Sequence, residues 1–187
     1  MKYPNKNKTY HKANISQANR GMSLEDDINK SNEYYLKMNK ANIHKKPTPI
    51  TIVKVDYPKR SAAKITEAYF KLPSTTDYNG IYKGKYIDFE AKECHSKTSF
   101  PFTSIHMHQI KHLQNVIEHG AIAFVILRMS HYNIDYLIKA EDFLNYYHNT
   151  KRKSLAYDWI IKNGHEIKLK YQCPCDYLNV IDEIYNI

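Results

Sequence analysis

The amino-acid sequence predicts an α/β fold in which a mixed central β-sheet is flanked by helices. Three observations favour this fold class. Residues 121–127 (AIAFVIL) form a continuous apolar run, as expected of a strand that is covered on both faces. Residues 86–92 alternate apolar and polar side chains, which is the pattern of a strand with two different faces. Apolar residues recur at helical spacing over residues 103–119, which predicts a helix.

The N-terminal part of this fold can be predicted element by element. Ser23 precedes three acidic residues in a first turn, so we expect a helix from there to about residue 39. Residues 41–47 are basic and end in proline, which predicts a short linker. Residues 50–57 (ITIVKVDY) alternate as a strand does, and Pro58 ends this strand.

Residues 58–76 separate two strands that ought to be neighbours. The segment is basic, has a partly helical pattern and ends near two aromatic residues, Tyr69 and Phe70. We expect it to project from the body as an insertion. Its aromatic side chains would then contact another subunit, the core or unpaired bases.

The C-terminal half supplies the remaining elements. Gly120 lies just past the helix predicted over residues 103–119, as expected at a helix stop. Residues 135–138 read as another strand and residues 140–147 as a short helix. The last predicted element is a closing segment over residues 177–185.

Length and charge favour a one-domain protein that binds nucleic acid. The chain has 187 residues, enough for one domain with a core, which we expect over residues 21–187. The net charge is +9, and residues 1–60 hold 13 Lys and Arg against 5 Asp and Glu. Residues 1–20 contain no acid and almost no apolar side chain, which predicts a flexible basic arm. A local basic excess of this kind favours phosphate backbones.

Composition also bears on location and on cysteine chemistry. The sequence contains no run of about 20 apolar residues, which excludes a transmembrane helix. Its three cysteines are sparse and odd in number, which fits a reducing compartment, so we expect a cytoplasmic protein. Cys173 and Cys175 have a spacing that could bind a metal, but no second pair faces them.

The residues with the most informative chemical pattern are Asp77, Glu90 and Lys92. On a strand over residues 86–92, Glu90 and Lys92 point to the same face. The carboxylate can hold a hard divalent cation, and the lysine beside it can offset charge that builds up on phosphorus. Asp77 lies upstream of a turn expected at Asn79-Gly80, which would fold it back beside Glu90 as a second ligand. Taken alone, an acid two residues before a lysine is also typical of a solvated ion pair.

Neighbouring polar residues leave alternatives open. Asp88 shares the strand face of Glu90 and could be a competing ligand or a supporting residue. Glu25 could hold a second metal, orient a ligand or complement the dipole of the first helix. His108 and His112 have zinc-ligand spacing on a helix, but the H-E-x-x-H frame is missing. With His106, they are interpreted as DNA-facing or packing residues.

Four longer motifs carry a more specific signal. They are RGMSLEDD (20–27), HKKPTP (44–49), YPKRSAA (57–63), and STTDYNGIYKG with IDFEAKE (74–93). In these motifs the chain closely resembles the RecU-type Holliday junction resolvases of low-G+C Gram-positive bacteria, mollicutes and their phages. The resemblance is strong over residues 19–140 and weak over the last forty residues, which look divergent.

This resemblance implies a nuclease of the PD-(D/E)xK superfamily, with a restriction-endonuclease-like core and a projecting stalk at about residues 58–76. It implies a homodimer that uses Mg²⁺, with Mn²⁺ as a substitute, and cuts four-way DNA junctions symmetrically. The implied partners are four-way and branched DNA, a second copy of the chain, and recombinase and branch-migration proteins.

The resemblance also implies roles for individual residues. Asp77, Glu90 and Lys92 would be catalytic, and Lys92 would stabilise the transition state. The implied metal ligands are Thr75, Asp77, Glu90 and Gln109, and the implied DNA contacts are Arg20, Lys45, Arg60, Tyr69 and Phe70.

Two other functions are compatible with parts of the sequence. A junction-binding and strand-annealing protein with little cleavage would need only the basic arm and the stalk. A restriction-type or general duplex nuclease would need the acids but not the stalk-like insertion. Asp77, Glu90 and Lys92 favour cleavage over binding alone, because binding does not require acids near phosphate.

Overall fold

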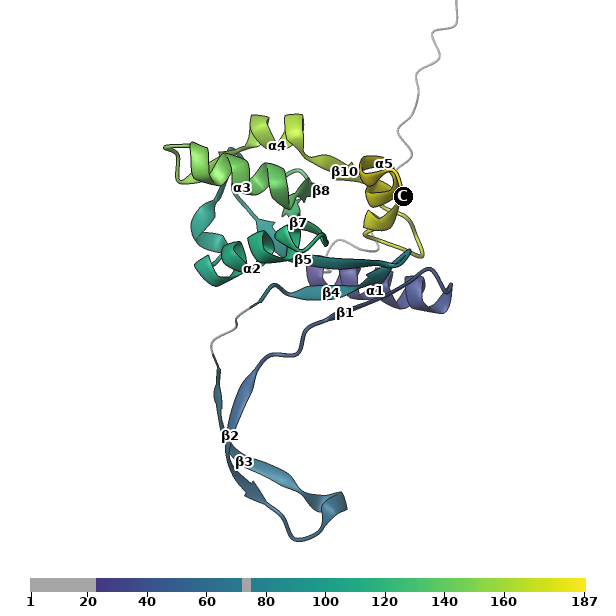
Figure 1. Ribbon diagram of the computed structural model, residues 1–187, viewed down its shortest axis with the longest axis vertical. Coiled ribbons are helices and arrows are strands. Elements are labelled where there is room, and N and C mark those ends of the chain that lie inside the picture. Colours follow the sequence, from purple (N-terminus) through teal and green to yellow (C-terminus); the bar gives the residue numbers. More distant parts are fainter. Residues whose placement is uncertain (1–22, 72–74) are drawn as a thin grey trace, which may run out of the picture.

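The computed structural model describes residues 23–71 and 75–187. Its centre is a six-stranded mixed sheet with the strand order β1-β4-β5-β7-β8-β10 (Figure 1). The pairing of β5 with β7 is parallel, and the other four pairings are antiparallel. The strands are β1 (Ala41–Lys45), β4 (Tyr78–Tyr82), β5 (Lys85–Cys94), β7 (Ile122–Met129), β8 (Ile134–Lys139) and β10 (His165–Ile167).

Helices cover both faces of this sheet, as the sequence predicts, and each face has its own hydrophobic core. One core joins β4, β5 and β7 to α1 (Leu24–Lys37) and α5 (Tyr177–Tyr185). The other joins β7 to α2 (Met107–Glu118), α3 (Ala140–Asn149) and α4 (Tyr157–Asn163). A small sheet of β6 (Ser99–Pro101) and β9 (Ser154–Ala156) lies beside the second core.

The buried strand β7 and the two-faced strand β5 confirm the sequence patterns that predicted them. Every residue of β7 is buried, because the strand has a neighbour on each side and a core on each face. On β5, Ile87 and Phe89 point into the core shared with α1 and α5. The Phe89 ring stacks against Tyr78 at 4.9 Å and against Phe124 at 4.7 Å between ring centroids.

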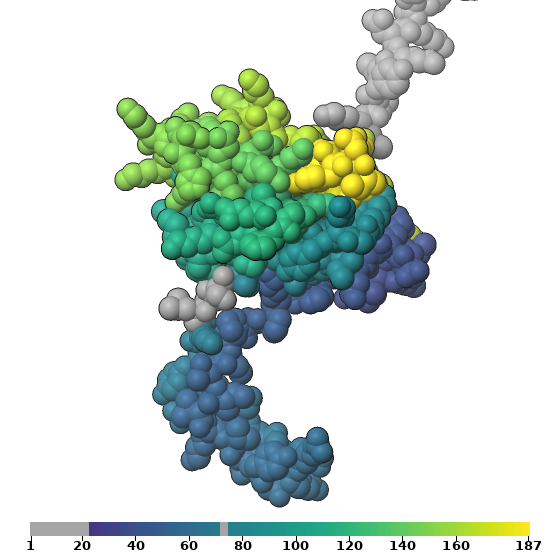
Figure 2. Space-filling view, viewed as in Figure 1, coloured from purple at the N-terminus to yellow at the C-terminus, as the bar shows by residue number. Residues whose placement is uncertain are grey.

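A two-stranded hairpin projects from the body (Figures 1 and 2). It consists of β2 (Ile50–Asp56) and β3 (Lys64–Phe70), joined through a short 3₁₀ helix at Arg60–Ala62. Every residue of both strands is exposed. The prediction of a partly helical element after residue 58 is therefore wrong for Lys64–Phe70, which pair as a strand with β2.

Two more local predictions differ from the structure. The predicted linker at 41–47 contains β1, which forms the sheet edge against β4. Asn79 and Gly80 are not a turn but lie inside β4, and the turn falls at Lys83-Gly84, where both residues have positive φ. A side chain on Gly80 would collide with the backbone of Ile43 in β1, so this glycine permits close strand contact.

The start of α1 agrees with the sequence-based prediction, but the start of α2 does not. Ser23 caps α1 as predicted, and its hydroxyl accepts a hydrogen bond of 3.2 Å from the Asp26 amide. Helix α2 begins at Met107, because Phe102–Ser104 form a separate 3₁₀ turn. The predicted helix start at residue 103 is therefore wrong, and His106 occupies the N-cap position of α2. No helix in the described part of the chain is long and apolar enough to cross a membrane.

Candidate active site

Strand β5 positions the acidic and basic residues that its pattern singled out. Asp88, Glu90 and Lys92 lie on the strand face opposite Ile87 and Phe89. The side chains of Asp88 and Glu90 are fully buried, since β5 is flanked by β4 and β7 and covered by α2. Two buried carboxyl groups need hydrogen-bond donors, a neighbouring positive charge or a bound cation.

Asp77 reaches the same place from the neighbouring strand. It directly precedes β4, whose first residue Tyr78 pairs with Phe89 of β5. The Lys92 ammonium lies 3.5 Å from Asp77 Oδ2 and also forms an ion pair with Glu90 Oε1. The three residues predicted to be catalytic are thus brought together, although the turn that does so lies at Lys83-Gly84.

The electrostatics of this cluster favour a positive charge beside the acids. Burial, and then the neighbouring Asp77 carboxyl, raise the pKa of Glu90 to about 8, with Lys92 opposing the shift. Burial alone would lower the pKa of Lys92, but Glu90 and Asp77 outweigh it and raise this pKa. A lysine whose pKa is raised stays charged and can face a phosphate.

The carboxyl groups fit a hard divalent cation. Glu90 Oε2 is buried and has no hydrogen-bond partner within the described residues, so it is free to bind a cation. Asp77 remains about one-third exposed, which leaves its carboxylate accessible. Among the residues that the structure describes, no three His, Cys, Asp or Glu side chains form a metal cluster. A cation held here would complete its shell with neutral oxygens and water, as Mg²⁺ commonly does.

Gln109 lies at the edge of this cluster, and Thr75 precedes Asp77 by two residues in the chain. The Gln109 amide donates a 2.7 Å hydrogen bond to Glu90 Oε1, and its carbonyl oxygen accepts one of 2.8 Å from the His106 backbone. Gln109 therefore contacts a predicted ligand directly and has a fixed amide orientation. Thr75 is half-buried, and its hydroxyl donates to the Thr76 carbonyl oxygen.

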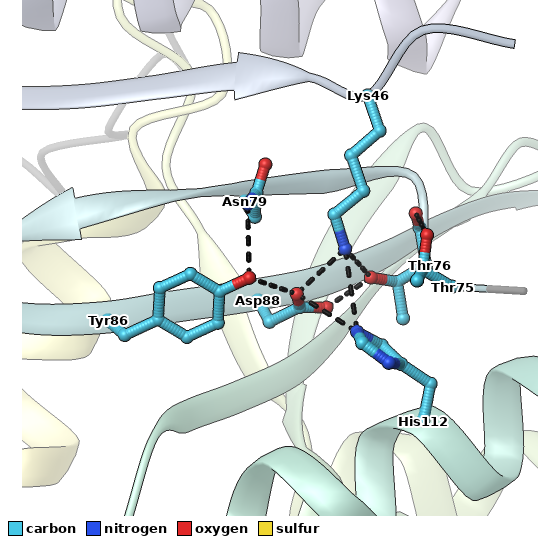
Figure 3. Close-up of polar contacts among 7 residues, drawn as sticks. All are labelled: Lys46, Thr75, Thr76, Asn79, Tyr86, Asp88 and His112. Carbon is cyan, nitrogen blue, oxygen red and sulfur yellow. Dashed lines mark hydrogen bonds and ion pairs between the residues drawn. The ribbon is translucent and has the colours of Figure 1, made fainter. Parts of the chain in front are cut away.

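Asp88 is engaged by protein donors on both of its oxygens (Figure 3). Thr76 Oγ1 donates to Oδ1, while Lys46 Nζ at 2.7 Å and the Tyr86 hydroxyl at 2.9 Å contact Oδ2. His112 Nε2 is 3.1 Å from the same oxygen. This leaves Asp88 as a supporting residue rather than a free ligand. Sequence reasoning missed Lys46 and Thr76, since neither has a chemical signal of its own.

His106, His108 and Glu25, the other polar residues singled out in the sequence, have contacts of their own outside the carboxylate cluster. The rings of His106 and His108 stack with centroids 5.5 Å apart, and burial, then His106 and Lys92, lower the pKa of His108. Glu25 forms a 2.5 Å ion pair with Lys45. It also lines a cavity of about 240 Å³ together with Asp77, so it lies near the cluster without joining it.

The predicted DNA contacts are spread over the chain rather than gathered at this site. Arg20 lies outside the described residues. Lys45 ends β1, and Arg60 begins the 3₁₀ helix of the hairpin. Tyr69 and Phe70 are 63% and 85% exposed on β3. Both aromatic side chains are therefore exposed to solvent on β3, the second strand of the projecting hairpin.

Comparison with known proteins adds independent information. The family profile described as Recombination protein U, RecU, matches residues 19–183. A "Holliday junction resolvase RecU" of Geobacillus kaustophilus strain HTA426 is 51% identical over 195 residues, spanning 99% of this chain and 98% of its own. The protein with the same description from Oceanobacillus iheyensis is 51% identical over 195 residues, spanning 99% of this chain and all of its own length. Similarity thus extends through the last forty residues, which were expected to be divergent.

Among solved structures, an Archaeoglobus fulgidus Holliday junction resolvase, Hjc, overlaps 72% of this chain and 90% of its own. Its TM-score is 0.41 and its sequence identity 11%, an overlap too loose to support a conclusion.

Proposed function

The chain belongs to the RecU family of recombination proteins, and on that premise we propose that it is a magnesium-dependent endonuclease that resolves four-way DNA junctions. The observation that supports cleavage most strongly is that Asp77, just before β4, lies beside Glu90 and Lys92 of the neighbouring strand β5. Two carboxylates and a lysine at one point suit the hydrolysis of a phosphodiester.

Each residue of the cluster has a role in this proposal. Asp77 and Glu90 would hold Mg²⁺, or Mn²⁺ in its place, through carboxylate oxygens, of which Glu90 Oε2 is buried and lacks a partner in the described chain. Thr75 and Gln109 are the proposed neutral oxygen ligands. In the absence of a cation the Gln109 amide nitrogen donates to Glu90 and its carbonyl oxygen accepts from the His106 backbone, so metal binding would require this amide to turn its oxygen toward the cation. The bound cation would supply a Lewis acid and a water of lowered pKa beside the scissile phosphate. Lys92 would offset the charge that develops on the phosphorus oxygens.

Discrimination of branched DNA is assigned to the hairpin. Arg60, Tyr69 and Phe70 are exposed on it and could contact phosphates and partly unstacked bases at a branch point. The basic residues 1–20, with Lys45, would add attraction for the DNA backbone that weakens with salt.

Symmetric resolution requires two active sites, so we propose a homodimer that cuts opposing strands. The same proposal includes a cytoplasmic location and transient partners among recombinases and branch-migration proteins. Buried, unpaired thiols at Cys94, Cys173 and Cys175 are compatible with a reducing compartment.

A junction-binding and strand-annealing protein with little cleavage is disfavoured by the carboxylate cluster. Two acids placed toward a phosphate repel it unless a cation is bound. In a protein that only bound DNA, the buried Glu90 oxygen without a hydrogen-bond partner among the described residues would have no role in binding.

The test is incubation of the protein with labelled mobile four-way junctions and with linear duplexes of the same sequence. We expect paired nicks on opposite strands of the junction in Mg²⁺, none in EDTA, and little cleavage of the duplex. Cleavage of both substrates at equal rates would indicate a general duplex nuclease instead. Binding without cleavage in Mg²⁺ or Mn²⁺ would support the strand-annealing function.

A further inference from the structure

The two ends of the projecting hairpin meet at one buried carboxylate. Lys46 lies where the chain leaves β1 for the hairpin, and Thr76 lies where it returns to β4. Both side chains contact Asp88 of β5, as Figure 3 shows. The hairpin therefore joins the body at a point held by the same strand that carries Glu90.

Hydrogen bonds link Lys46, Thr76 and Asp88 to one another. Lys46 Nζ donates hydrogen bonds to Asp88 Oδ2 at 2.7 Å and to Thr76 Oγ1 at 2.9 Å. Thr76 Oγ1 donates in turn to Asp88 Oδ1. The backbone amide of Lys46 also donates a 2.8 Å hydrogen bond to the carbonyl oxygen of Asp77. Asp77 is thus tied by its own backbone to the segment that leads into the hairpin.

We propose that Lys46, Thr76 and Asp88 form a clamp that positions Asp77 opposite Glu90 and fixes the base of the hairpin to the active site. The three are positioning residues in this proposal, since they would act through Asp77 and not on the reacting phosphate. This inference rests on the proposed nuclease function. It would make the placement of a metal ligand depend on the same contacts that hold the DNA-binding hairpin.

The burial of Asp88 explains why the clamp should be rigid. A fully buried carboxylate is tolerated only when paired and hydrogen-bonded. Lys46 supplies the charge, Thr76 and the Tyr86 hydroxyl supply donors, and His112 Nε2 lies 3.1 Å from the same oxygen that Lys46 contacts. If any of these donors moves away, the buried Asp88 carboxylate loses a hydrogen bond. Conformations in which only part of the clamp is formed are therefore unfavourable.

A purely structural role predicts a different pattern of effects. If Asp88 served only to stabilise the sheet, its loss would loosen β5 and β7 as a whole. The clamp instead predicts loosening at Lys46 and Asp77, because these two are joined by one hydrogen bond outside the strand ladders. Local opening of this kind can be measured by amide hydrogen exchange.

The experiment compares Asp88→Asn and Thr76→Val with a matched control, Asp182→Asn. Asp182 also accepts hydrogen bonds from a tyrosine and a lysine, Tyr82 and Lys83, but away from the cluster. The first readout is exchange of the Lys46 amide in the metal-free protein, with the Val125 amide of β7 as the reference. The second is the Mg²⁺ concentration that gives half-maximal junction cleavage under single-turnover conditions.

We expect the Lys46 amide to exchange at least about tenfold faster in both clamp variants, with Val125 unchanged. The Mg²⁺ requirement should rise by about 10- to 100-fold, the usual effect of removing a residue that orients a metal ligand. The Asp182→Asn protein should match wild type in both readouts. An unchanged Lys46 amide, or equal acceleration at Val125, would overturn the clamp. A wild-type protein that did not cleave would instead refute the nuclease proposal, and the exchange data would still decide the clamp.

Discussion

The Lys92 ammonium lies 3.5 Å from the Asp77 carboxylate, although Lys92 is on β5 and Asp77 directly precedes the neighbouring strand β4. The same ammonium forms an ion pair with Glu90. A single lysine therefore contacts both acids to which metal binding is assigned. Its charge can stabilise the two carboxylates in the absence of a cation and can turn to a phosphate when one is bound.

Removal of this lysine should affect the rate of cleavage far more than binding. We expect Lys92→Ala to lose about 10²-fold or more in single-turnover cleavage of a four-way junction, as when one preorganised electrostatic group is removed. Junction affinity in Ca²⁺ should change little, because the DNA contacts are assigned elsewhere. A fall in affinity that matches the fall in rate would make Lys92 a phosphate-binding residue instead.

The pKa of Glu90 predicts how the stability of the metal-free protein depends on pH. This pKa is raised from 4.5 to about 8 in the folded chain, so the folded state binds more protons than the unfolded state between these values. The free energy of unfolding should then fall as pH rises through this window. Thermal unfolding in EDTA should show this fall for wild type and a smaller one for Glu90→Gln. Equal slopes for the two proteins would contradict the burial of an ionisable Glu90.

The exposed aromatic residues of the hairpin should determine selectivity for branched DNA. We expect Tyr69→Ala and Phe70→Ala each to weaken junction binding by about 1 kcal/mol or more, the scale of one base–aromatic stack. Affinity for plain duplex should be less affected. Tyr171→Ala is a suitable control, since Tyr171 is 96% exposed on a loop that is not assigned to DNA binding. Equal losses on junction and duplex, measured by fluorescence anisotropy, would assign the hairpin to general backbone binding.

The parts of the fold that were predictable are those where local pattern and burial agree. Strand β7 is apolar throughout because it is buried on both faces, and β5 alternates because its two faces differ. The alternation on β5 also sufficed to put Glu90 and Lys92 on one face. These features need only the period of a strand and no knowledge of its neighbours.

The features that could not be predicted depend on pairing between distant segments. Lys64–Phe70 is exposed throughout and contains lysine, glutamate and alanine, so no hydrophobic period marks it as a strand; only pairing with β2 does. Asn79-Gly80 resembles a hairpin turn, yet Gly80 serves the close approach of β1. The contacts of Asp88 with Lys46 and Thr76 likewise exist only once β1, β4 and β5 are side by side.

The most direct test of the proposed active site is Glu90→Gln assayed on one labelled four-way junction for both binding and cleavage. The substitution keeps the size of the side chain and removes the charge that would hold the cation. We predict that paired cleavage in Mg²⁺ is abolished while junction affinity stays within about threefold of wild type, because the charged DNA contacts are unchanged. Cleavage at a wild-type rate by the Glu90→Gln protein would contradict the assignment of this cluster as the active site.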